Sequence, residues 1–166
     1  MNVDRIQQLI DRLKLVEEEH PEAFNMDDWF SMSDDDGIFA ETAWISGNIK
    51  LLDEYSCGTV GCIAGWACAT FWDELKPEEI IRVGDSGESP RVNIPATAAV
   101  ALGLDDTERQ YLFIGWWTDT SKVLEQISVG EAIEELEFIL ADPQQFEDRV
   151  SRYRNEDLWC EGGSES

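Results

Sequence analysis

Basic residues are scarce in this chain: 12 Lys and Arg stand against 36 Asp and Glu among 166 residues, for a formal net charge of −24. Such a surface repels nucleic acid and anionic membranes, which excludes direct binding to either. Histidine is scarcer still, because His20 is the only one. A catalytic thiol needs a base within reach, and the His20-Pro21 context is typical of a turn. We therefore expect no enzyme, no metal and no cofactor.

Long hydrophobic runs are also missing. No stretch approaches the roughly 18 apolar residues that a membrane-spanning helix needs, and the first residues lack the basic and apolar regions of a secretory signal. Apolar content is nevertheless 43%, with seven Trp and seven Phe, which argues against disorder. These features predict a folded, soluble protein of the cytoplasm.

Helical periodicity predicts the fold class. The pattern favours a mainly α, compact single-domain protein of about six to seven helices over residues 1–160, with 161–166 as a flexible tail. The first helix buries one apolar stripe and ends near His20-Pro21; the stripe is formed by Ile6, Leu9, Ile10, Leu13 and Val16.

Capping signals place the later helices. They run from Thr59, as N-cap, to Leu75; from Pro95 to Gly103; from Asp105 to Phe113; from Ser128 to about Leu140; and from Asp142 to about Arg154. Two β-prone runs between residues 80 and 94 fit either a small β-hairpin or a loop.

One segment is distinctive: Ser56-Cys57-Gly58-Thr59-Val60-Gly61-Cys62-Ile63-Ala64-Gly65-Trp66-Ala67. It resembles the C-G-T-x-x-C-x-A-G-x-A signature of small, uncharacterised proteins of bacteriophages, prophages and bacteria. Those proteins share an A-x-x-x-L-G-L segment, here Ala98–Leu104, before a helix that ends in Leu-Phe, here Leu112-Phe113. The resemblance implies a small helical fold and a mobile-element origin, and it brings no activity.

The cysteines have two interpretations. Cys57, Cys62, Cys68 and Cys160 do not follow a standard zinc spacing, and free cysteine is among the most buried residue types, which favours packing. Cys62, however, would fall in the first turn of the predicted helix, where exposed N–H groups lower a thiol pKa. A metal- or redox-dependent domain that uses Cys57 and Cys62, with Cys68 or Cys160 assisting, stays open.

Acidic side chains gather in separate clusters. On the helix that begins after Ser128, Glu131, Glu134 and Glu135 lie opposite the apolar stripe, and Phe138 falls on their side. This face is either solvated, with Phe138 covered by the C-terminal helix, or a contact surface for a basic, hydrophobic partner. A charge magnitude of about 2–8 is enough for the solubility of a small domain, so the excess favours a partner, although adaptation to high salt would also produce it.

We therefore expect an acidic interaction protein, encoded by a phage or mobile element, that binds and inhibits a basic host protein that handles nucleic acid. Its carboxylates would imitate the phosphates of a duplex. An acidic structural or assembly protein without an inhibitory role stays open. The predicted partner-binding residues are Glu17, Glu18, Glu19, Asp27, Asp28, Trp29, Asp34, Asp35, Asp36, Glu131, Glu134, Glu135 and Phe138.

Overall fold

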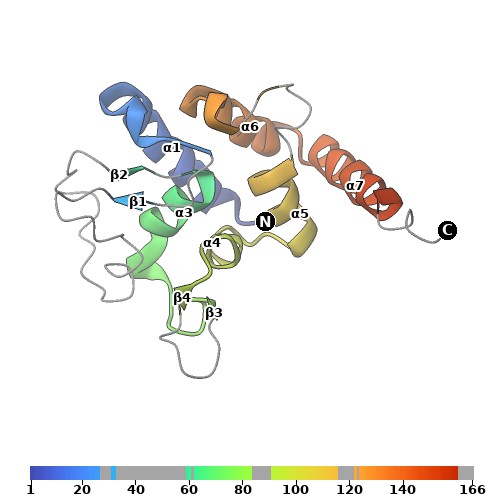
Figure 1. The fold of residues 1–166 in the computed structure, drawn as a ribbon, viewed down its shortest axis with the longest axis horizontal. Helices are drawn as coiled ribbons and strands as arrows, with labels where there is room; N and C mark the ends of the chain where they lie inside the picture. The colour runs from blue at the N-terminus through green and yellow to red at the C-terminus, as the bar shows by residue number, and fades with distance from the viewer. Residues whose placement is uncertain are drawn as a thin grey trace.

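The structure is a computed structural model, and it describes residues 1–26, 31–32, 59–60, 62–83, 91–115, 122 and 124–160. It is mainly α-helical, as the sequence predicts (Figure 1). The helices are α1 (Val3–Glu19), α3 (Ile63–Phe71), α4 (Ile94–Leu102), α5 (Asp106–Gln110), α6 (Val129–Ala141) and α7 (Pro143–Cys160). A π-helical turn, Tyr111–Gly115, continues α5. Short 3₁₀ turns cover Pro21–Ala23, Trp72–Glu74 and Leu124–Gln126.

Two short antiparallel strand pairs join these helices. Strand β1 (Ser31–Met32) pairs with β2 (Thr59–Val60), and β3 (Arg82–Val83) pairs with β4 (Arg91–Val92). The second pair lies where the sequence allowed a hairpin. The first pair corrects a prediction: Thr59 is not a helix N-cap but lies in β2, and α3 begins later, with Cys62 as its N-cap.

Local signals explain most helix boundaries. Asn2 caps α1 by accepting a hydrogen bond from Arg5 N, and His20 is the C-cap at the end of the helix. The predicted capping boxes are present at Asp105 for α5 and at Ser128 for α6. Asp142 Oδ1 accepts from Gln145 N at 3.0 Å at the start of α7, and that helix extends past the predicted end at Arg154.

Gly103 ends α4 in a left-handed conformation, with φ of +65°. Glycine adopts this conformation without the strain that a Cβ atom brings. The N-terminus also passes close by: Asn2 N donates to Leu102 O at 2.7 Å, and a Cβ built on Gly103 would lie 3.1 Å from Asn2 N. Glycine is therefore required here for both its backbone freedom and its size.

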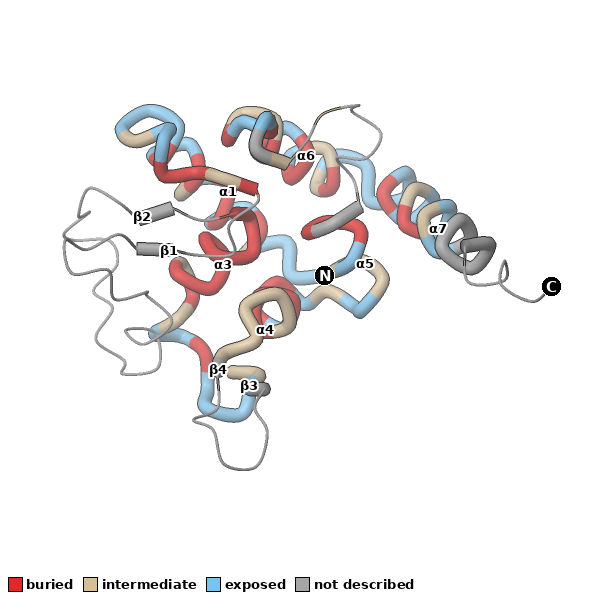
Figure 2. Tube along the Cα trace, in the orientation of Figure 1, coloured by how far each residue is buried: buried red, intermediate tan, exposed pale blue. Residues whose placement is uncertain are grey.

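One hydrophobic core connects the helices. α1 packs on α6, and α3 packs on α4. The α1 stripe that the sequence predicts is buried, with Ile6, Leu9, Ile10 and Leu13 fully inaccessible. Nearly all of α3 is buried, whereas α1, α6 and α7 alternate buried and exposed residues (Figure 2). Because burial of one such aliphatic side chain contributes about 1.5–3 kcal/mol, this core stabilises the fold.

Candidate functional site

The structure places part of the predicted partner-binding set. Glu17, Glu18 and Glu19 form the last turn of α1, and Glu131, Glu134, Glu135 and Phe138 lie on α6. The remaining members lie outside the described residues; they are Asp27, Asp28, Trp29, Asp34, Asp35 and Asp36. The described clusters are therefore the ones whose geometry bears on a candidate site.

The last turn of α1 lies beside the first turn of α6. A Cβ built on Gly130 would lie 2.6 Å from Oε1 of Glu17, and Lys14 Nζ donates to Glu137 Oε1 at 2.6 Å. Glu17, near the end of α1, meets Gly130 at the start of α6, whereas the earlier Lys14 meets the later Glu137. The two helices therefore run antiparallel. Glu17 thus reaches the N-terminal turn of α6, where the helix dipole favours a carboxylate.

An exposed row of carboxylates follows this helix pair. Gly130, Glu134 and Glu137 share one face of α6, because residues three and four apart are neighbours on a helix. Lys14, Glu17 and Glu18 have the same spacing on α1. We call the four exposed carboxylates the α1–α6 edge; they are Glu17, Glu18, Glu134 and Glu137.

Glu137 was missed by the sequence analysis, although its spacing from Glu134 was a usable signal. In the α1–α6 edge it pairs with Lys14, and hydrogen bonding to Glu137 raises the pKa of Lys14. Both side chains are about half exposed, at 51% for Lys14 and 50% for Glu137. Solvent screens such a pair strongly, so the edge keeps its negative character.

Glu131 has a structural task at the start of α6. Its Oε2 accepts from Ser128 N at 3.0 Å, while Ser128 Oγ accepts from Glu131 N at 3.3 Å. Lys122 Nζ also forms a short ion pair with its Oε1. The hydrogen bond from Lys122, followed by those from Ser128, lowers the pKa of Glu131. This carboxylate is therefore committed to helix capping rather than to a free surface.

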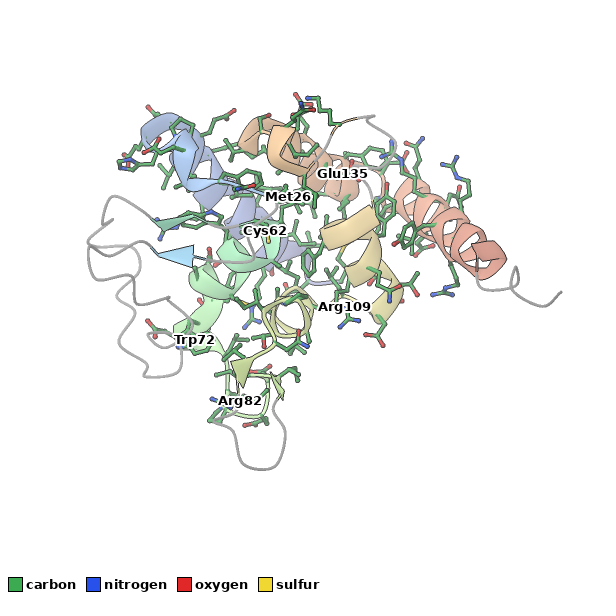
Figure 3. All side chains as sticks on the ribbon, in the orientation of Figure 1. Met26, Cys62, Trp72, Arg82, Arg109 and Glu135 are labelled. Carbon is green, nitrogen blue, oxygen red and sulfur yellow. The ribbon has the colours of Figure 1, made fainter. Side chains whose placement is uncertain are left out.

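Glu135 corrects the predicted surface. It does not lie on a solvated face: its residue is only 9% exposed, at the junction of α6 with α7 (Figure 3). Arg149 of α7 donates from Nη1 to Glu135 Oε2 at 3.3 Å. The guanidinium carbon of Arg149 also lies 3.9 Å from the centroid of the Phe138 ring. The C-terminal helix therefore contacts Phe138, which was one of the two interpretations of that residue.

The two cysteines with described side chains are buried. Cys62 is 1% exposed and Cys68 is fully buried. Burial raises the pKa of the Cys68 thiol, which donates to the Ile94 carbonyl at 3.4 Å. The expectation that Cys62 falls in the first turn of the helix is wrong, because Cys62 is the N-cap of α3, one residue before the helix begins. Cys57 and the Cys160 side chain lie outside the described part.

Within the described part of the chain, no three His, Cys, Asp or Glu side chains come together as a metal site. No helix among the described residues is long and apolar enough to cross a membrane.

Comparison with known proteins finds no matching family model, no matching curated protein and no matching solved structure. The resemblance of the segment that begins at Ser56 to small phage and bacterial proteins therefore stays a prediction.

Proposed function

We propose that this chain is a non-enzymatic, acidic interaction protein that binds a basic host protein and inhibits its work on nucleic acid. It acts without a cofactor, in the cytoplasm, and comes from a phage or mobile element. The observation that carries this proposal is the α1–α6 edge, which presents Glu17, Glu18, Glu134 and Glu137 to solvent, with Lys14 paired to Glu137.

The spacing of this edge supports imitation of nucleic acid. Glu134 and Glu137 are three residues apart on α6, so their Cβ atoms lie about 5–6 Å from each other. The antiparallel α1 adds Glu17, whose carboxylate reaches Gly130 of the same helix. A groove lined with Lys and Arg that receives the phosphates of a duplex makes charge-assisted hydrogen bonds to oxyanions. Carboxylates offer the same acceptor chemistry, and the net charge of −24 attracts such a groove from a distance.

The redox or metal alternative has weaker support. A redox role requires accessible thiolates, whereas Cys62 and Cys68 are buried and the pKa of Cys68 is raised. A metal role requires several ligands together, and among the described residues no three His, Cys, Asp or Glu side chains form such a group. An acidic assembly protein without an inhibitory role would carry the same edge, so it is one outcome of the test.

The test compares two charge-matched variants of the full-length protein. Glu18→Gln with Glu19→Gln removes one charge of the edge and the exposed charge next to it, and Glu147→Gln with Asp148→Asn removes two exposed charges from α7. Immobilised proteins are exposed to a lysate of the native host, and each captured protein is then titrated with salt and with duplex DNA. We expect the first variant to lose capture and the second to keep it.

Two further readouts decide the interpretation. An electrostatic complex weakens steeply with salt, because the Debye length is only about 10 Å at 0.1 M, and duplex DNA displaces a partner that is held at its phosphate site. The second readout is the activity of the captured protein on nucleic acid, which this protein should inhibit. Equal capture by both variants contradicts it, and a partner that DNA does not displace favours the assembly alternative.

A further inference from the structure

Arg149 of α7 is held in a specific setting on α6. Its guanidinium carbon lies 3.9 Å from the Phe138 ring centroid, and its Nη1 lies 3.3 Å from Glu135 Oε2. A planar guanidinium that stacks on an aromatic ring while it pairs with a carboxylate is a recognition geometry that lysine does not reproduce. We call Phe138 and Glu135 the arginine seat. α6 therefore carries a site for one arginine, and the protein's own α7 fills it.

Among the described side chains of α7, which end at Arg154, few others attach the helix to the rest of the protein. Phe146 and Val150 are buried, and Phe146 and Tyr153 make edge contacts with Tyr111, with ring centroids 5.8 and 5.9 Å apart. Arg154 Nε donates to Thr107 Oγ1 at 3.2 Å. The other described side chains of α7 are mostly exposed, and the helix lies at one edge of the molecule with its C-terminal end pointing away (Figure 1).

The body beneath α7 has an unusual backbone. Phe146 and Tyr153 of α7 both contact Tyr111, the first residue of the π-helical turn Tyr111–Gly115. π-helical turns are rare and occur frequently at functional sites. The π-helical turn and the arginine seat thus lie on the same face of the protein, the face that α7 covers.

We propose that α7 is a displaceable arm, and that the face beneath it is the docking site for an arginine-bearing amphipathic helix of the basic partner. The partner's arginine replaces Arg149 between Phe138 and Glu135, and its apolar residues replace Phe146 and Val150. This inference rests on the proposed function for the existence of a basic partner, whereas the opening of α7 does not depend on it. Because the site is free only while α7 is undocked, the arm lowers the apparent affinity for that helix.

The first experiment uses α7 itself as the probe. A fluorescent peptide with the sequence Pro143–Cys160 is titrated with full-length protein. We expect weak binding to the wild type, because its own arm fills the seat, and binding about tenfold tighter to Arg149→Ala, because its arm undocks more often. A peptide that carries Lys in place of Arg149 should bind the Arg149→Ala protein more weakly than the unchanged peptide.

Arg152→Ala is the matched control, since Arg152 is an exposed arginine on the same helix and its loss changes the charge equally. It should bind the peptide as weakly as the wild type does. Equal peptide affinity for the wild type, Arg149→Ala and Arg152→Ala overturns the proposal. If Arg149→Ala does not fold, Arg149→Lys takes its place, because it keeps the charge and loses the planar stacking.

The second experiment measures amide hydrogen exchange, which reports local opening of each helix. The amides of α7 should exchange faster than those on the buried face of α1, and Arg149→Ala should accelerate exchange in α7 by more than it does in α1. If α7 and α1 exchange at the same rate in both proteins, α7 opens only on global unfolding and the proposal fails. Glu18→Gln with Glu19→Gln should change neither readout, which separates failure of this inference from failure of the proposed function.

Discussion

α1 and α7 both pack on α6, but they do so by different means. α1 buries five apolar residues against the core, and its ion pair to α6, Lys14 with Glu137, is half exposed. Among the described side chains of α7, those up to Arg154, Phe146 and Val150 are buried. Its ion pair to α6, Arg149 with Glu135, is much less exposed, at 33% and 10%. The apolar contacts therefore hold α1, whereas a charged side chain has a central part in holding α7.

The comparison shows why a count of carboxylates does not define a surface. Glu134, Glu135 and Glu137 lie within four residues on one helix, yet Glu134 is exposed, Glu137 meets a solvated lysine and Glu135 is buried under an arginine. A charge pair in a low-dielectric setting interacts several times more strongly than the same pair in water. Four predictions test this difference, from the largest expected effect to the smallest.

Leu13→Ala should have the largest effect. Leu13 is fully buried in α1, and removal of such a side chain costs about 2–5 kcal/mol through lost burial and a residual cavity. Val150→Ala is the counterpart on α7 and should cost roughly 1.5 kcal/mol. Urea unfolding of both variants measures the difference. Equal losses would show that α7 is held by its apolar contacts as firmly as α1.

Arg149→Ala should lower the free energy of unfolding by about 2–3 kcal/mol, because it leaves the buried Glu135 carboxylate without the guanidinium. The double substitution Glu135→Leu with Arg149→Leu should recover most of this loss, since well-packed apolar residues replace buried ion pairs at little cost. Urea unfolding checks both variants. A loss below about 0.5 kcal/mol for Arg149→Ala would place this pair among ordinary surface pairs.

Glu131→Gln tests the capping carboxylate through pH. Because the folded-state pKa of Glu131 is lowered, its contribution is present above the ordinary glutamate pKa of about 4.3. The contribution is lost as the pH falls through the lowered folded value. Thermal unfolding at pH 6 and pH 3.5 should therefore show a smaller acid-induced loss for Glu131→Gln than for the wild type. Glu134→Gln, an exposed neighbour on α6, is the control and should behave as the wild type does.

Lys14→Met should have the smallest effect. Its pair with Glu137 is solvated on both sides, so the Coulomb energy gained is nearly offset by screening and by the side-chain entropy lost. A double-mutant cycle of Lys14→Met and Glu137→Gln in urea unfolding measures the coupling. A coupling as large as that of Arg149 with Glu135 would remove the contrast between the two pairs.

The helices were predictable because their signals are local. The stripe that begins at Ile6 has the spacing of one helical face, and the Ser128–Glu131 and Asp105–Glu108 capping boxes each close within one turn. Gly103 marks the end of α4 for the same reason. The start of α3 was predicted wrongly because the reason lies far away in the sequence. Thr59–Val60 pairs with Ser31–Met32 as a strand and so is not part of the helix.

The sequence by itself determined a mainly helical body and a strong negative charge, since composition, periodicity and caps depend on residues that are close along the chain. Only the tertiary structure decided which carboxylates are exposed. The partner of Glu135 lies 14 residues away on another helix, and Lys14 reaches Glu137 across 123 residues. With so few bases for so many acids, the free surface depends on where folding places each base, and that is set by long-range packing.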